Sequence, residues 1–163
     1  MKNVLIPTDF TLETLQLVNK TAEALKGEKF NAVLFHAFDL PDSIIDLMFI
    51  GREKIYSGLV SDDFRNQCKK VKNLYFETIN SVCVKYMYGN TVRVFKNFAD
   101  ANNISLIVLP EELRLQLPHK YSMNPVSILK KSGLQLLSTF ERAEGKVSVV
   151  DAQKKESFSF TQM

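Results

Sequence analysis

Strand-length apolar runs alternate with segments of helical period along most of this chain, and this alternation limits the fold more than any other feature. The expected strands are residues 4–8, 32–38, 82–89, 104–109 and 134–140, and the expected helices between them are 11–26, 61–80, 91–102 and 125–131. The runs VLIPT, AVLFHAF and ISLIVL are apolar on both faces, as strands covered on both sides by helices must be. Strands joined through helices of this length form parallel sheets with right-handed crossovers.

Capping residues mark the expected helix ends. Thr11, Ser61 and Asn90 are residue types whose side chains accept hydrogen bonds at helix N-termini, and Gly27 suits a C-terminus. A short helix is also expected within residues 43–50. Its run IIDLMFI is interpreted either as a segment folded over the sheet edge or as an exposed partner surface.

These elements predict a single-domain, three-layer α/β sandwich over residues 1–140, with a five-stranded parallel, Rossmann-like sheet and helices on both faces. A chain of 163 residues with 45% hydrophobic residues suits one domain with a full core. Residues 141–163 hold two strand-like pieces around a charged turn and predict a C-terminal hairpin or tail.

Composition excludes several function classes. The formal net charge of +3 gives no strongly basic field, so we expect no nucleic-acid partner. No run of about 18 apolar residues exists to span a membrane, and Met1-Lys2 precedes a strand rather than a signal peptide, so we expect a cytoplasmic protein without a membrane partner. Cys68 and Cys83 lack metal or redox spacing and are interpreted as small core residues.

The carboxyl ends of the strands form the candidate site, because ligands of such folds bind there, where strand order reverses. Asp9, His36, Gly89 and Pro110 all fall at these ends. Asp9 has three possible roles: it caps the turn, it catalyses, or it holds a ligand. His36 is interpreted as a hydrogen-bonded core or rim residue, and His119 as a solvated loop residue. The spacings predict no metal site.

The sequence predicts no enzyme. IPTDFTL echoes the Asp-x-Asp-x-Thr-Leu pattern of haloacid dehalogenase phosphatases, but the nucleophilic aspartate falls at Pro7, which cannot form an acyl-phosphate. There is no G-x-S-x-G elbow and no H-x-x-x-H or H-E-x-x-H pair. No set of catalytic residues is therefore assigned.

Three local matches resemble the universal stress protein family. VLIPTDFTLETLQLV is similar to the family's first strand and helix, AVLFHAF to its second strand, and SLIVLP with SILKKSGLQLLSTF to its fourth strand, last helix and fifth strand. The likeness covers roughly residues 2–140. It implies an adenine nucleotide alpha hydrolase-like fold, a homodimer, and a role in stress response or signalling. In members that hold ATP, the residues matching Asp9 and the backbone near Ala37 approach the adenine.

The phosphate loop departs from the family pattern Gly-x2-Gly-x9-Gly-Ser/Thr. Pro110 and Leu113 stand where the first two glycines are expected. A phosphate cradle needs inward-facing N–H groups at positive φ, whereas proline has no N–H and a fixed φ. Glu111 and Glu112 add negative charge where a triphosphate would lie.

We therefore expect a non-enzymatic protein of stress response or signalling that acts by protein association, without ATP, AMP or another cofactor. The alternative is a nucleotide- or small-anion-binding module at the rim near Asp9, with Ala37, Arg114 and Asn124 as further contacts and with His119, Lys120 or Ser122 as possible anion contacts. A homodimer is expected through residues 134–140 or the tail, since sheet edges leave unpaired backbone groups. The protein partner is not identified by the sequence.

Overall fold

The computed structural model describes residues 1–39, 58–140, 146–151 and 156–161. The short helix expected within residues 43–50 lies outside these ranges. The elements, in chain order, are β1 (Lys2–Pro7), α1 (Leu12–Ala24), β2 (Phe30–Phe38), α4 (Asp62–Leu74), β3 (Ile79–Tyr88), α5 (Val92–Ala101), β4 (Ile104–Val108), α6 (Val126–Lys130), β5 (Gln135–Leu137), β6 (Lys146–Asp151) and β7 (Glu156–Thr161).

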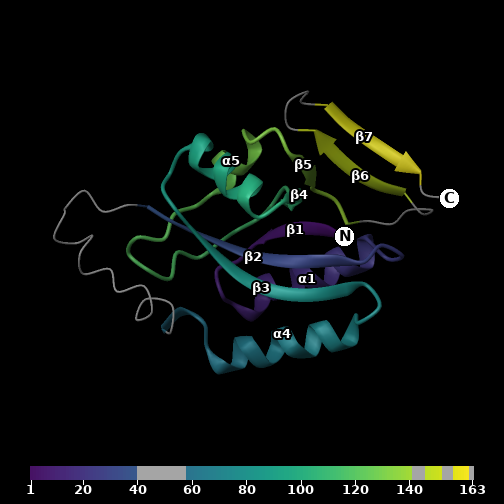
Figure 1. Cartoon of the computed structure of the whole chain (residues 1–163), viewed down its shortest axis with the longest axis horizontal. Helices are drawn as coiled ribbons and strands as arrows, with labels where there is room; N and C mark the ends of the chain where they lie inside the picture. Colours follow the sequence, from purple (N-terminus) through teal and green to yellow (C-terminus); the bar gives the residue numbers. More distant parts are fainter. Residues whose placement is uncertain (40–57, 141–145, 152–155, 162–163) are drawn as a thin grey trace.

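The strands form one sheet in the order β3-β2-β1-β4-β5-β6-β7 (Figure 1). The first five strands are parallel, which confirms the predicted five-stranded parallel sheet. From β1 the chain moves outward to β2 and β3, and then returns to place β4 on the other side of β1. Strand order therefore reverses between β1 and β4, and the loops after these two strands frame the place where ligands bind in such sheets.

Helices cover both faces of the sheet. α1 and α4 pack together over one face, and α5 and α6 over the other. In β1, Val4 and Ile6 join the first core cluster whereas Leu5 joins the second. Phe35 of β2 meets Phe95 of α5 edge-on, with ring centroids 5.6 Å apart. The apolar residues on both faces of β1 and β2 thus fill two separate cores.

Two of the three predicted N-caps are confirmed. The side chains of Thr11 and Ser61 accept hydrogen bonds from the third backbone N–H of α1 and α4, respectively. Asn90 was the wrong residue for α5, because Thr91 caps this helix and accepts from Val94. Thr91 has the extended backbone of an N-cap and lies three residues before Val94, which is the spacing that this bond requires.

The helix expected over residues 61–80 ends earlier than predicted. α4 stops at Leu74, and Ile79, expected on its buried stripe, begins β3 beside Phe30 of β2. The Phe30 N–H donates to Thr78 O at 2.9 Å, so pairing with β2 stabilises the extended backbone there. Helical period alone carried no information about this pairing. β5 is likewise shorter than the expected 134–140 and spans Gln135–Leu137.

The C-terminal tail extends the sheet. β6 pairs antiparallel with β5, and β7 pairs antiparallel with β6. β6 therefore pairs with the edge of β5, which was one of the two dimer contacts that the sequence predicted. The outer strands of the described sheet are β3 and β7. Among the described residues, no helix has the length and hydropathy needed to span a bilayer.

Candidate functional site

Asp9 lies at the mouth of β1 with 5% of its surface exposed. Its Oδ1 accepts hydrogen bonds from the Thr11 N–H at 3.1 Å, the Thr11 hydroxyl at 2.5 Å and the Thr14 hydroxyl at 2.9 Å. Its Oδ2 accepts from the Gln116 N–H at 2.9 Å. Burial alone raises the pKa of Asp9, but the hydrogen bonds from Thr11, Gln116 and Thr14 outweigh it and lower the pKa below its usual value. An ionised carboxylate thus ties the loop after β4 to the start of α1.

Phe10 gives the turn after β1 a fixed shape. Its φ of 65° lies in the left-handed region, which a bulky residue adopts only when its surroundings hold it there. The Thr8 hydroxyl accepts its N–H at 3.0 Å, and its ring packs against those of His36, Phe64 and Tyr86 with centroids 4.9, 5.8 and 6.1 Å away. The turn that carries Asp9 is therefore anchored at the next residue as well.

His36 is a buried link between β1 and the loop before α6. Its Nδ1 donates to the Thr8 carbonyl at 2.8 Å, because a carbonyl can only accept, and its Nε2 then accepts from the Ser122 hydroxyl at 2.8 Å. The Ser122 oxygen accepts in turn from the His119 N–H at 3.2 Å. Burial lowers the pKa of His36 and favours the neutral ring that this bonding needs. This geometry agrees with the interpretation of His36 as a hydrogen-bonded core residue.

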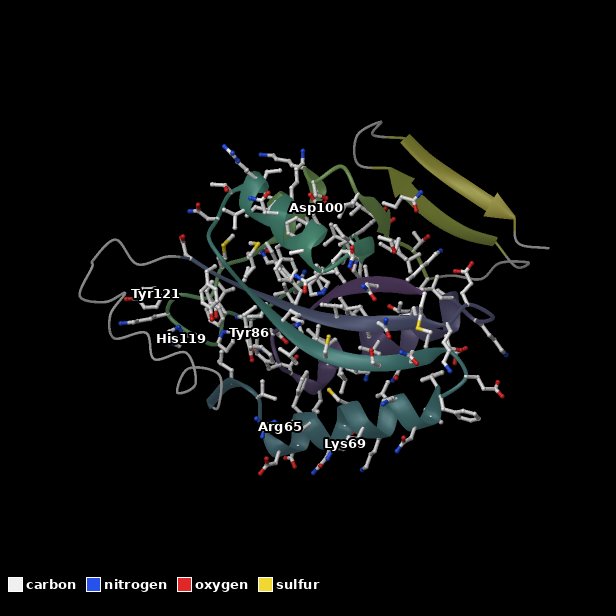
Figure 2. The ribbon with its side chains drawn as sticks, viewed as in Figure 1. Arg65, Lys69, Tyr86, Asp100, His119 and Tyr121 are labelled. Atoms are coloured by element: carbon white, nitrogen blue, oxygen red, sulfur yellow. The ribbon has the colours of Figure 1, made fainter. Side chains whose placement is uncertain are left out.

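The last part of the loop between β4 and α6 is hydrogen-bonded to the backbone at the end of β2. The Met123 N–H donates to Ala37 O at 3.0 Å, and the Asp39 N–H donates to Tyr121 O at 2.7 Å. Between these bonds, Phe38 and Ser122 form an antiparallel bridge. Figure 2 shows His119 and Tyr121 together at this end of the sheet, with Tyr86 nearby. The main chain near Ala37, where the family resemblance implies an adenine contact, is thus hydrogen-bonded to the chain itself.

The loop after β4 begins with a tight turn instead of a glycine cradle. The Leu113 N–H donates to Pro110 O at 3.2 Å, and the half-buried Leu113 side chain packs against both core clusters. Near the end of the loop, the Asn124 Oδ1 accepts from the Val126 N–H at 3.0 Å and orders the start of α6. Backbone donors of this loop therefore serve its own turn, through Leu113, and the ends of β1 and β2, through Gln116 and Met123.

The four predicted ligand contacts lie in different surroundings. Asp9 follows β1, and Ala37 lies near the end of the neighbouring strand β2. Asn124 precedes α6 and accepts from the Val126 N–H. Arg114 instead lines a groove of about 440 Å³ between α1 and the loop after β4. Asp9 and Ala37 thus lie at the ends of neighbouring strands, and Arg114 lines the same groove as Thr14, a hydrogen-bond partner of Asp9.

Sequence reasoning missed the partners that fill the rim. Thr14 has a signal in the sequence, since Asp9, Thr11 and Thr14 have the spacing of a capped first turn. Gln116 contributes through its backbone, for which no residue-type signal exists. Ser122 was considered only as an anion donor, although its hydroxyl bonds to His36. Within the part of the chain that the structure describes, no group of three or more His, Cys, Asp or Glu residues is placed to hold a metal ion.

The comparisons with known proteins place this geometry in a known fold. No protein-family model matches the sequence. No curated protein matches it at a significant level. Among solved structures, the hypothetical protein PH0823 is 24% identical, with 86% of this chain and 99% of that one aligned and a TM-score of 0.54.

Two further solved structures also align with the chain. The hypothetical protein MJ0577, the subject of a structure-based assignment of biochemical function, is 16% identical over 85% of this chain and 94% of its own, with a TM-score of 0.51. A universal stress protein in complex with cAMP is 15% identical over 85% of this chain and 96% of its own, with a TM-score of 0.47. The chain therefore has the adenine nucleotide alpha hydrolase-like α/β fold that its resemblance to universal stress proteins implies.

Proposed function

We propose that this protein is a non-enzymatic, universal stress protein-like protein of stress response or signalling. It acts in the cytoplasm through association with other proteins and does not bind ATP in the way that glycine-loop members of the family do. The observation that carries this proposal is the filled strand rim, where Ala37 O and both oxygens of Asp9 accept hydrogen bonds from the chain's own loops.

The filled rim favours protein association over a nucleotide-binding module. A nucleotide in the usual pose of the family needs the main chain near Ala37, which Met123 occupies. It also needs the loop after β4 to present N–H groups, whereas Pro110 has none to give and the Gln116 N–H is committed to Asp9. Glu111 and Glu112 are exposed on this loop and add repulsion toward phosphates.

Calorimetric titration of nucleotide-free protein with ATP tests the proposal. We expect no saturable binding below millimolar concentration, because binding has to break the loop contacts at the rim. AMP and inorganic phosphate, titrated in the same way, test the alternative of a small-anion module that includes Arg114. Saturable binding of ATP in the micromolar range, abolished by Asp9→Asn, would overturn the proposal.

We further propose that the protein forms a homodimer through its C-terminal hairpin. β7 is an outer strand of the extended sheet, and one edge of such a strand leaves backbone N–H and C=O groups for another chain. Sedimentation equilibrium at tens of micromolar protein tests this contact, with a chain truncated after residue 140 as the comparison. We expect a dimer for the full chain and a monomer for the truncated chain. A monomeric full chain would refute the dimer, and a dimeric truncated chain would place the contact elsewhere.

A further inference from the structure

The outer face of α4 carries a cluster of basic side chains. Phe64 and Val71 bury the opposite side of this helix against the core. Four basic side chains are exposed along its length, and we call them the α4 basic face: Arg65, Lys69, Lys70 and Lys72. Figure 2 labels Arg65 and Lys69 on α4. From Arg65 to Lys72 the face spans about 10 Å of helix.

The positive charge of this face is weakly compensated. Within the described residues, the salt bridge recorded for it joins Arg65 to Asp62 at 3.6 Å, and both side chains are largely exposed. An exposed pair of this kind stabilises the fold little and is readily exchanged for another partner. The neighbouring acidic residues lie at the two ends of the face: Asp62 and Asp63 start α4, and Glu77 together with Glu23 of α1 lies at its other end.

Two large apolar side chains lie directly after the basic face. Leu74 is 70% exposed and Phe76 is 66% exposed, which distinguishes them from the buried apolar residues of α4. They line a cavity of about 220 Å³ together with Ala22 and Glu23 of α1, Lys26 just after this helix, and Tyr75, Glu77 and Thr78. The Tyr75 hydroxyl, between them in the chain, donates to Glu23 of α1 at 3.0 Å. Exposed apolar side chains gathered at a concave site mark interaction surfaces in soluble proteins.

We propose that the α4 basic face, together with Leu74 and Phe76, is a docking surface for an acidic segment of a partner protein. An acidic run of about three extended residues spans the length of the basic face, and an apolar residue beyond it packs on Leu74 and Phe76. This inference rests on the proposed function, because it assigns a surface to the protein association. It gives that partner a chemistry: clustered carboxylates next to a large apolar side chain.

The charge pattern favours such a segment over other occupants. A flat anionic membrane meets the whole outer surface, including Asp62, Asp63 and Glu77, and these carboxylates repel it. A second copy of the chain would place one basic face near another of the same charge. A short acidic segment places its carboxylates on the basic residues, and its uncharged apolar end lies beside Glu23 and Glu77.

Fluorescence anisotropy with a labelled synthetic peptide tests the surface in the full chain. The probe is a short acidic peptide in which leucine and phenylalanine follow runs of glutamate. We expect saturable binding that weakens as salt is added, since exposed charges are screened. Lys69→Glu with Lys72→Glu should weaken binding at least about tenfold, and Leu74→Gln with Phe76→Ser should weaken it similarly.

Matched variants test whether the loss of peptide binding depends on the position of the changed residues or only on the net charge and the number of exposed leucines. Lys130→Glu with Lys131→Glu makes the same change in net charge on the opposite face of the sheet, and Leu12→Gln removes an exposed leucine at another helix end. Both should leave peptide binding within about twofold of wild type. Far-UV circular dichroism verifies that every variant is folded.

Three outcomes would overturn this inference: no saturable binding of the peptide, equal loss in the α4 and α6 charge variants, or binding to phosphatidylserine vesicles in preference to the peptide. Micromolar ATP binding together with intact peptide binding would instead refute the proposed loss of nucleotide binding and leave the docking surface in place. If the peptide does not bind while the protein still dimerises, the docking surface is refuted and the proposed homodimer is not.

Discussion

Replacing Asp9 with asparagine is expected to destabilise the protein by about 2–3 kcal/mol, which is the contribution of one hydrogen bond to a charged group. The amide keeps the shape of the side chain, and its oxygen can still accept from Thr11 and Thr14. Its nitrogen, however, takes the place of Oδ2, which in the wild-type protein lies 2.9 Å from the Gln116 nitrogen and accepts its N–H. Two donors then oppose each other, and the loop after β4 loses its bond to the turn after β1.

Urea denaturation at pH 7 measures this loss, and amide hydrogen exchange at Gln116 locates it. Asp100→Asn serves as the control, because this exposed aspartate lies near the end of α5 (Figure 2). A surface change of this kind stays within about 0.5 kcal/mol of wild type. If Asp9→Asn stays within the same limit, or if Gln116 exchanges no faster, Asp9 does not hold the loop as described.

The pH dependence of this difference has a definite sign. The hydrogen bonds to Asp9 lower its folded-state pKa below the unfolded value, so its contribution to stability is complete above the unfolded pKa of about 3.9. This contribution is lost as pH falls through the folded pKa. The gap between wild type and Asp9→Asn should therefore be constant from pH 7 to pH 5 and close in stronger acid. A gap that closes already near pH 6 would point to another titrating group.

Three further predictions concern other buried groups. Burial lowers the pKa of His36, so its contribution to stability is present above the unfolded pKa of about 6.5 and is lost as pH falls through the folded pKa. His36→Gln should flatten the stability profile in this window in urea titrations, and an unchanged profile would contradict this linkage. Burial raises the pKa of Cys68 to about 11 from 9.0. Iodoacetamide at pH 8 should therefore label Cys68 about a hundredfold more slowly in the native protein than in urea. Equal labelling rates would contradict the burial of this thiol. Gly89→Ala should cost about 1–3 kcal/mol in thermal or urea unfolding, because φ is 123° there and the added Cβ would lie 3.1 Å from Val94; an unchanged midpoint would contradict that contact.

The sequence predicted the parallel sheet because the signals for its strands are local. Segments such as AVLFHAF are apolar at every position except His36, and a run that is apolar on both faces is typical of a strand covered on both sides. The end of α4 was missed because the competing interaction, the pairing of Phe30 with Ile79, joins residues far apart in the chain. The cap of α5 was missed by one position, since Asn90 and Thr91 are both good capping residues and only backbone geometry chooses between them.

The candidate site was less predictable than the fold for the same reason. Asp9 and Ala37 were placed correctly at neighbouring strand ends, because parallel strands end on the same edge of a sheet. What occupies them depends on the path of a loop of more than ten residues between β4 and α6, and no local pattern specifies that path. Every non-proline residue has a backbone N–H group, so the hydrogen bonds from the Gln116 and Met123 N–H groups have no sequence signature.

We propose that the occupied rim opposes nucleotide binding through a free-energy barrier that does not depend on the missing glycines. A ligand at this rim must break the bonds from Met123 to Ala37, from Asp39 to Tyr121 and from Gln116 to Asp9. At about 1 kcal/mol for each backbone pair and about 2 kcal/mol for the charged one, opening costs about 4 kcal/mol. Under this proposal, that cost would weaken the binding of a ligand by a factor of about a thousand, which would turn an intrinsically micromolar site into a millimolar one. Restoring glycine at Pro110 and Leu113 alone therefore leaves most of the barrier in place, because all three bonds lie outside the turn that these two residues form.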